Sequence, residues 1–418
     1  MTPESECGAC RDASRRGQLS ALCFCGRQTT TGSGDDTCGP ARPGSGGCSK
    51  PADNSNLATP INARKAIMSQ QVCFYGDGLS LTATETATLL ARLASTPPGI
   101  DIDSYSRGGV VAELETRVAR MLGKESAIFL PTGTMANHLA VRALCEGRGR
   151  RILAQADSHL VNDAGDCAQV LSGLNVVPMA PGQPCFSAAD VALELERASN
   201  SKAAVPVGAV SIESPIRRMD NAAVPMADLV AVTTAARGAG IGLHMDGARL
   251  PLYAAHLGVA PADVAALFDT VYVSMWKCFN APSGAVLAGA ADLIDKLYHS
   301  RRMMGGSLPA VWPFAAIALH HLDDFEAESI SVLAMAEQLF SRLEASGRCQ
   351  VLRVANGTNV FRLRLAQGDP EQWRTNAQAW GVELPAPDAI NGEFICKMNP
   401  TWLRSTADDL AQALLESI

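Results

Sequence analysis

The chain has 418 residues, of which 47% are hydrophobic and 18% are charged, and its formal net charge is −7. This length favours a large domain together with a smaller one, with enough apolar surface to build a core. The negative charge argues against nucleic acid or an anionic membrane as a partner, and no uninterrupted apolar stretch approaches the ~18 residues of a membrane-spanning helix. We therefore expect no nucleic acid partner and no membrane association.

The cysteines are distributed unevenly along the chain. Six of the thirteen lie within residues 1–48, and the other seven are spread singly through the rest. Single, scattered cysteines are typical of reduced thiols, so we expect a cytoplasmic protein. The amino-terminal cysteines have irregular spacing and no nearby histidine, so we expect no metal site.

Composition and periodicity divide the chain into three parts. Residues 1–66 are rich in Gly, Ser, Thr, Pro and Cys without helical or strand periodicity, which predicts a disordered tail. From about residue 80, short apolar runs alternate with stretches of helical spacing, as in a parallel sheet covered by helices. We expect an α/β large domain over 67–322 and a small α+β carboxy-terminal domain over 323–418.

Several predicted strands of the large domain end directly on polar residues. In chain order these strands are 127–131, 152–155, 210–213, 242–246, 270–276 and 284–288. In open α/β sheets ligands bind beyond the carboxyl ends of the strands, so the residues that follow these runs are the ones to search for chemistry. In the small domain the pattern predicts a helix over 325–345, a strand over 359–365 and a closing helix over 407–417.

The first chemical motif is the turn 131–137 (PTGTMAN), where an apolar strand gives way to a helix. Gly133 allows close backbone approach and Thr134 adds a hydroxyl donor. Free N–H groups at a helix amino terminus attract a phosphate through hydrogen bonds and the helix dipole. Taken alone, the segment favours a helix cap that binds no ligand.

The second motif is a buried-looking strand that ends at Asp246 and is followed by Arg249. A carboxylate in this place can keep a pyridinium nitrogen protonated. That protonation makes the ring of pyridoxal 5′-phosphate (PLP) an electron sink. The alternative is an aspartate that caps a helix beside a surface arginine.

The third motif is the apolar run 270–276, which delivers a lone lysine, Lys277. Burying an unpaired ammonium group is costly, so this lysine should be neutralised, paired or covalently used. A Schiff base with PLP would remove that cost. The alternative is a lysine whose amine extends to the surface just past the strand.

In this order the three motifs resemble the threonine aldolase and β-eliminating lyase family of PLP enzymes of fold type I. The resemblance covers about residues 72–418 and is strongest over 112–306. The runs that carry it are 112–125 (AELETRVARMLGKE), 131–137, 244–250 (HMDGARL), 281–289 (APSGAVLAG) and 302–306 (RMMGG).

The resemblance implies how the chain would hold its cofactor. Lys277 matches the Schiff-base lysine of the family, and Asp246 matches the partner of the pyridine nitrogen. Gly133 and Thr134 match the residues that cradle the phosphate. These four assignments agree with the chemistry expected from the residues themselves.

The resemblance also implies how a substrate would be handled. His159 matches the histidine that stacks on the cofactor ring and helps in proton transfer, and Arg249 matches the arginine that binds the substrate carboxylate with its planar guanidinium. Gly76 stands where a carboxylate-binding serine is usual. Around residues 394–397 the family usually has a second arginine that binds the substrate carboxylate. Here only Lys397 and Arg404 lie nearby.

Retro-aldol cleavage of a β-hydroxy-α-amino acid to glycine and an aldehyde is the reaction that the resemblance implies first. A base removes the β-hydroxyl proton and the Cα–Cβ bond breaks. β-Elimination and racemisation of another amino acid use the same cofactor residues and remain alternatives, as does a PLP-binding protein without turnover. The resemblance further implies a homodimer or homotetramer, in which residues 104–106 would reach the neighbouring subunit's site.

Overall fold

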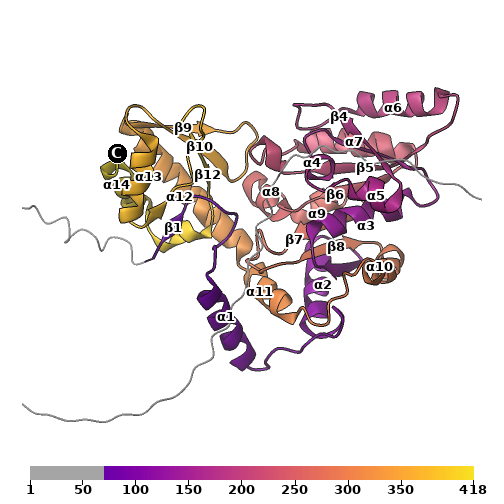
Figure 1. Cartoon of the computed structure of the whole chain (residues 1–418), viewed down its shortest axis with the longest axis horizontal. Coiled ribbons are helices and arrows are strands. Elements are labelled where there is room, and N and C mark those ends of the chain that lie inside the picture. The colour runs from indigo at the N-terminus through magenta and orange to yellow at the C-terminus, as the bar shows by residue number, and fades with distance from the viewer. Residues whose placement is uncertain (1–69) are drawn as a thin grey trace, which may run out of the picture. The chain divides into compact units, whose positions relative to one another are not determined.

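The computed structural model describes residues 70–418, so the tail expected over 1–66 lies outside the described residues. Their largest element is a seven-stranded sheet with the strand order β2-β8-β7-β6-β5-β3-β4 (Figure 1). Its strands are β2 (Ser126–Leu130), β3 (Arg151–Gln155), β4 (Asn175–Met179), β5 (Val207–Glu213), β6 (Gly242–Asp246), β7 (Thr270–Ser274) and β8 (Ala285–Gly289). Within this sheet β8 runs antiparallel to both of its neighbours, β2 and β7, and the other pairs are parallel.

The six strands predicted from apolar runs are confirmed, with ends that shift by a few residues. The seventh strand, β4, was not predicted. Its sequence NVVPM contains Pro178, and only part of it is buried, so it offers no continuous apolar run. β4 is the edge strand of the sheet, where a proline removes no ladder hydrogen bond.

Helices cover both faces of the sheet. Alternate side chains of a strand point to opposite faces and are buried in two different hydrophobic cores. Ile128 and Leu130 pack with α3 (Gly133–Cys145) and α10 (Ala291–Met303), whereas Phe129 between them belongs to the core on the other face, with α2 (Gly109–Met121). The remaining helices of this part are α1 (Ala83–Ser95), α4 (His159–Asn162), α5 (Cys167–Ser172), α6 (Ala188–Asn200), α7 (Met226–Gly238), α8 (Leu250–Leu257), α9 (Pro261–Ala265), α11 (Trp312–Leu322) and the 3-10 turn Arg217–Met219.

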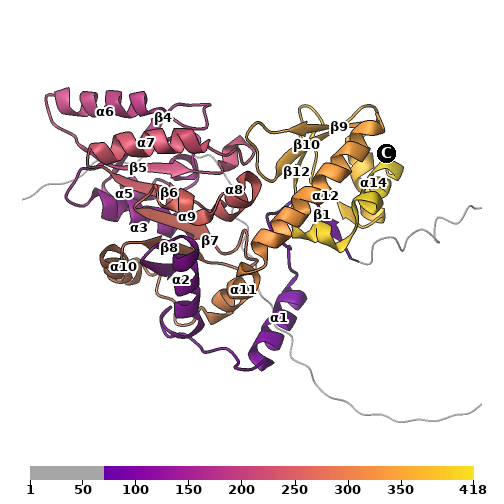
Figure 2. The same cartoon turned by 180° about the vertical axis from the view of Figure 1, so that it is seen from behind.

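The carboxy-terminal part has a sheet and a core of its own. The long helix α12 (Phe325–Ala345) packs on β9 of a three-stranded antiparallel sheet ordered β12-β10-β9 (Figure 2). The elements of this part are α12, β9 (Cys349–Arg353), β10 (Val360–Leu365), α13 (Pro370–Ala379), β11 (Val382–Glu383), β12 (Phe394–Lys397), the 3-10 turn Pro400–Arg404 and α14 (Ala407–Glu416). The helix predicted over 325–345 and the strand and closing helix predicted after it are therefore confirmed.

The start of the described chain joins this carboxy-terminal core. The short strand β1 (Val72–Cys73) pairs in parallel with β11. Val72 and Phe74 are buried among the apolar side chains of the carboxy-terminal core. Residues 72–74, which the composition had grouped with the large domain, therefore pack with the carboxy-terminal sheet. A two-residue strand has no periodicity that could have revealed this.

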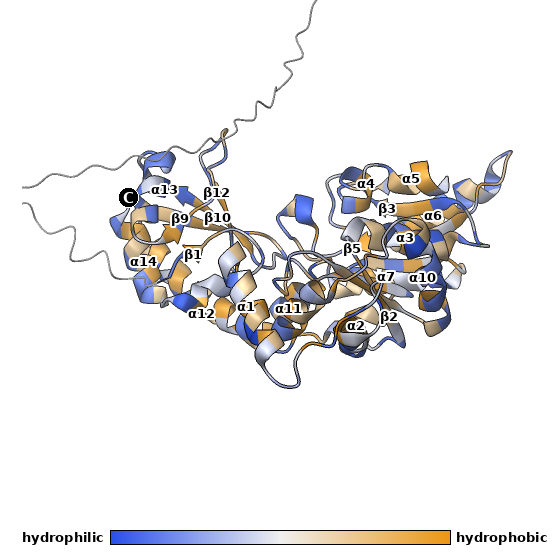
Figure 3. Cartoon of the chain, turned by 60° about the horizontal axis from the view of Figure 1, so that its bottom comes forward, coloured by the Kyte–Doolittle hydropathy of each residue, from blue (hydrophilic) through white to orange (hydrophobic). Residues whose placement is uncertain are grey.

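Hydrophobic residues are concentrated along the strands and the inner faces of the helices (Figure 3). Within residues 70–418, no helix is both long enough and apolar enough to cross a membrane.

Candidate active site

The predicted polar residues gather at one edge of the large sheet. Because β5, β6 and β7 are parallel, their carboxyl ends lie together, and the register pairs Glu213 with Asp246 and Asp246 with Tyr272. His159 begins α4, shortly after the carboxyl end of β3, and Lys277 follows β7. The residues that the sequence assigned to cofactor chemistry are thus delivered to the same edge.

The turn that the sequence predicted to bind a phosphate lies at the amino terminus of α3. The side chain of Thr132 caps the helix by accepting a hydrogen bond from the backbone N–H of Met135 at 3.2 Å. The first N–H groups of the helix, at Gly133 and Thr134, have no partner inside the helix. A Cβ atom at Gly133 would lie 2.0 Å from the hydroxyl of Tyr272, so only glycine fits here.

Asp246 is buried at the end of β6, with 4% of its surface exposed. Its Oδ2 atom accepts a hydrogen bond of 2.5 Å from Asn137 Nδ2, on α3, and its Oδ1 atom accepts one of 3.2 Å from the backbone N–H of Ala248. No cation forms an ion pair with Asp246 among the described residues. Its carboxylate is therefore held by neutral donors, which leaves its charge available to a cationic partner.

Lys277 is half-buried beyond the end of β7, with its Nζ atom 5.4 Å from the ring centre of Trp276. Burial, followed by the positive charge of Arg249, lowers the pKa of Lys277 from its ordinary value, although Asp246 and Asp77 act in the opposite direction. A lowered pKa increases the fraction of neutral amine, which is the form that reacts with an aldehyde.

His159 is fixed through its backbone by Glu213. The N–H of His159 donates to Glu213 Oε2 at 2.5 Å, and the N–H of Arg217 donates to Glu213 Oε1 at 2.9 Å. Burial, together with the nearby charge of Asp246, raises the pKa of Glu213 to about 7. No contact was assigned to Glu213 from the sequence, so its anchoring of His159 is new from the structure.

Arg249 is buried and already paired with an acidic residue. Its Nε and Nη2 atoms lie 2.9 and 2.8 Å from Asp77 Oδ2. Lys397 Nζ and Asn359 Nδ2 reach the other oxygen of Asp77, at 2.9 and 3.3 Å. Arg249, Asp77 and Lys397 together carry one net positive charge, which suits a substrate carboxylate.

Asp77 was assigned no role from the sequence. It lies 172 positions before Arg249 and 320 before Lys397, in a loop without helical or strand periodicity. The charged cluster that it joins could not be deduced from local pattern, although Lys397 was noted near the place where the family usually has a second carboxylate-binding arginine.

Several polar atoms around the site have no hydrogen-bond partner within residues 70–418. Ser274 Oγ at the end of β7, Ser158 Oγ and His159 Nδ1 are buried without a hydrogen bond among the described residues. Buried polar atoms normally find a partner, so unpaired ones mark a place where a polar ligand would complete the bonding. With the glycine turn and the half-buried lysine, these atoms fit a phosphate-bearing cofactor.

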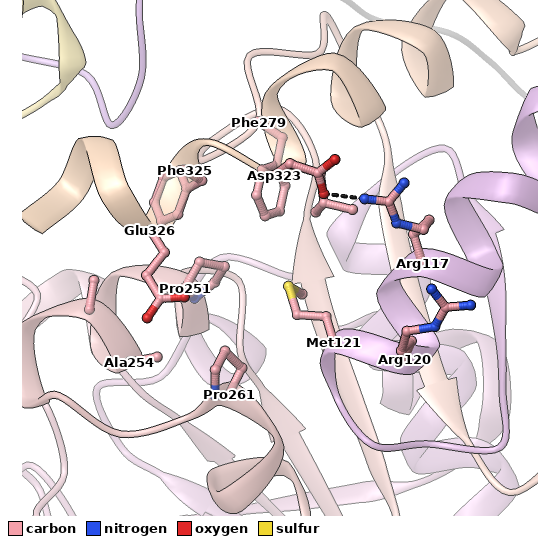
Figure 4. Close-up of a pocket in the computed structure, with 12 residues that line it drawn as sticks. Arg117, Arg120, Met121, Pro251, Ala254, Pro261, Phe279, Asp323, Phe325 and Glu326 are labelled. Atoms are coloured by element: carbon pink, nitrogen blue, oxygen red, sulfur yellow. Dashed lines mark hydrogen bonds and ion pairs between the residues drawn. The ribbon is translucent and has the colours of Figure 1, made fainter.

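A separate pocket of about 340 Å³ lies between α2, α8 and the start of α12 (Figure 4). Arg117 and Asp323 form an ion pair at its rim, and the side chains of Met121, Phe279 and Glu326 line it. None of the residues predicted for catalysis or cofactor binding lines this pocket. Within residues 70–418, no cluster of His, Cys, Asp and Glu could hold a metal ion.

Comparison with known proteins identifies the family. A family model described as beta-eliminating lyase matches residues 80–365. The chain belongs to this family. The prediction that the chain is a lyase of the threonine aldolase and β-eliminating group is thereby confirmed.

The relatives of the chain carry more than one activity. The low specificity L-threonine aldolase of Saccharomyces cerevisiae is 27% identical over 301 residues, which are 71% of this chain and 75% of that protein. The alanine racemase TOXG of Cochliobolus carbonum is 28% identical over 220 residues, 53% of this chain and 55% of that protein.

Solved structures confirm the predicted fold. The threonine aldolase of Leishmania major superposes with a TM-score of 0.64 at 18% identity, covering 82% of this chain and 98% of that one. Other enzymes that share the fold have been solved with PLP bound, at 15–16% identity. The mainly parallel sheet between two layers of helices is thus that of PLP enzymes of fold type I.

Proposed function

We propose that this lyase is PLP-dependent and cleaves a β-hydroxy-α-amino acid to glycine and an aldehyde. The observation that carries the proposal is the gathering of Lys277, Asp246 and His159 at one sheet edge, beside the glycine turn of α3. The similarity to a low specificity L-threonine aldolase supports the same reaction.

The residues present would hold PLP at each of its functional groups. Lys277 would attach it through Nζ, and Asp246 would keep a proton on its ring nitrogen. The N–H groups of Gly133 and Thr134 would bind its phosphate, together with the unpaired hydroxyl of Ser274. When bound, PLP supplies an electron sink for a bond broken at the substrate Cα.

Two side chains would act on the substrate itself. Arg249, backed by Asp77 and assisted by the charge of Lys397, would bind and orient the α-carboxylate. His159 would lie against the cofactor ring, and its imidazole would take the proton of the β-hydroxyl group. Glu213 keeps the backbone of His159 in place for that transfer.

We also propose that the protein works in the cytoplasm as a homodimer or homotetramer. All seven cysteines within residues 70–418 are free thiols, which are typical of reducing compartments. Ile102, Tyr105 and Met303 are apolar side chains that are 50–66% exposed, and such exposed surface favours contact with another subunit.

The experiment that tests the reaction is a product assay on the purified protein with PLP. We expect glycine and acetaldehyde from L-threonine or L-allo-threonine, and glycine and benzaldehyde from phenylserine. Absence of glycine from all three would contradict aldol cleavage. Because the alanine racemase is also a relative, L-alanine should be tested in parallel, and formation of D-alanine would favour racemisation.

A further inference from the structure

Asp246 is the last member of a buried chain of hydrogen bonds that joins α3, β6 and β7. Asn137 Nδ2 lies 2.5 Å from Asp246 Oδ2, and Asn137 Oδ1 lies 2.9 Å from His244 Nε2. His244 Nδ1 lies 2.9 Å from Thr270 Oγ1. Asn137, His244 and Thr270 are each exposed by 1% or less, so these polar groups must satisfy one another.

The chemistry of the groups determines which atom donates and which accepts in each hydrogen bond of this network. An ionised Asp246 can only accept, so Asn137 presents its NH₂ group to it and its carbonyl oxygen to His244. His244 must then donate through Nε2. Burial lowers the pKa of His244 to about 4, so the ring is neutral near pH 7 and carries one N–H. Nδ1 therefore accepts, and the Thr270 hydroxyl donates.

We propose that Thr270, His244 and Asn137 are positioning residues that orient the Asp246 carboxylate toward the ring nitrogen of PLP. The inference rests on the proposed function, because it assigns these three side chains to the same cofactor. None of them carries a charge, so they orient the carboxylate without neutralising it.

The hydroxyl of Thr270 completes this hydrogen-bond network, because it donates to the Nδ1 atom of His244 when the ring proton is on Nε2. Without that donor, His244 can carry its proton on Nδ1, and Nε2 then becomes an acceptor. Asn137 must turn its amide to donate to Nε2, which places Oδ1 against the Asp246 carboxylate. Two facing oxygens repel each other, so the carboxylate turns away and no longer holds a proton on the ring nitrogen.

The test compares Thr270→Val with Thr270→Ser in the full chain, each loaded with PLP that carries ¹⁵N at the ring nitrogen. Valine has nearly the shape of threonine without the hydroxyl, whereas serine keeps the hydroxyl. In wild type and Thr270→Ser we expect the ¹⁵N chemical shift of a protonated ring nitrogen. In Thr270→Val we expect a shift toward the unprotonated value and PLP binding weakened about tenfold.

The possible outcomes separate this inference from the proposed function. If Thr270→Val binds PLP with the ¹⁵N shift of wild type, the positioning role is wrong while PLP binding stands. If wild type takes up no PLP, the proposed function fails and this inference fails with it. Should Thr270→Val not fold, Asn137→Leu carries the test, because it removes the donor to Asp246 directly. A ¹⁵N signal of Asn137→Leu that moves toward the unprotonated value supports the inference. A ¹⁵N signal equal to that of wild type overturns it.

Discussion

Glu213 and Asp246 are adjacent buried carboxyl groups at the ends of β5 and β6. Burial, with the charge of Asp246, raises the pKa of Glu213 to about 7, from about 4.3 in an unfolded chain. Because its pKa is higher in the folded state, protonated Glu213 contributes stability that is fully present below its pKa in the unfolded chain. This stability is lost as the pH rises through its pKa in the folded protein. We predict that the apoprotein loses on the order of 1–3 kcal/mol of unfolding free energy between about pH 4.5 and 7.5.

Glu213→Gln should remove most of this pH dependence, because the amide does not ionise. Urea unfolding of the two apoproteins across that pH range measures the effect. Equal slopes of unfolding free energy against pH in wild type and variant would show that another group is responsible.

At the scale of single residues, the sequence could predict the side chains that follow long apolar runs. Asp246 and Lys277 stand at the ends of such runs, so burial and chemistry could be inferred together. Asp77 and Asn137 could not be assigned in this way. The partners of Asp77 are far away in sequence, and Asn137 lies inside a helix where nothing marks its contact with His244.

The amino terminus of α3 is the element whose geometry is most tightly constrained. Since a Cβ at Gly133 would lie 2.0 Å from the Tyr272 hydroxyl, Gly133→Ala must displace the first turn of the helix or the tyrosine. We predict PLP binding at least about tenfold weaker, measured by titration of the absorbance of the bound cofactor. Gly238→Ala, at the end of α7 with open space around it, is the matched control and should bind PLP as wild type does. Equal affinity in all three proteins would show that the turn does not hold the phosphate.

Among the elements, those with clear periodicity or apolar runs could be predicted and the short or edge ones could not. α12 has the predicted bounds because its apolar spacing continues over 21 residues. β4 was missed because it is a partly exposed edge strand with a proline, and β1 because it has only two residues. The antiparallel direction of β8 could not be read from its apolar run, which specifies burial and not orientation.

At the scale of the whole molecule, Asp77 joins three distant segments of the chain. Burial by itself would raise its pKa, but Arg249 and Lys397 more than offset this and hold the pKa well below its ordinary value. The ionised Asp77 therefore contributes unfolding free energy that is present above about pH 4 and is lost as the pH falls further. Removing the carboxylate leaves two cations unpaired, so we predict that Asp77→Asn lowers the unfolding free energy by about 3–5 kcal/mol near pH 7.

Urea unfolding measures this loss, and Asp163→Asn provides the control. Asp163 pairs with Arg217 and Arg218, whose side chains are nearly half exposed, so its loss should cost less than about 1 kcal/mol. Similar destabilisation by the two substitutions would mean that Asp77 contributes no more than a surface ion pair.

The assembly is a second property of the whole molecule, and it could be inferred only through the family resemblance. Equilibrium sedimentation should give a dimer or tetramer. Tyr105→Asp, in the exposed segment with Ile102, should shift the equilibrium toward monomer, whereas Leu193→Asp on α6 should not. A fully active wild-type monomer would rule out a shared site.

Reductive trapping shows whether Lys277 is the residue that holds PLP. The protein would be incubated with PLP, reduced with borohydride, digested and analysed by peptide mass spectrometry. We predict that the cofactor is found on the peptide that contains Lys277, and that Lys277→Ala loses both this adduct and the visible absorbance of the bound cofactor. An adduct on another lysine, or no specific adduct in wild type, would contradict the assignment.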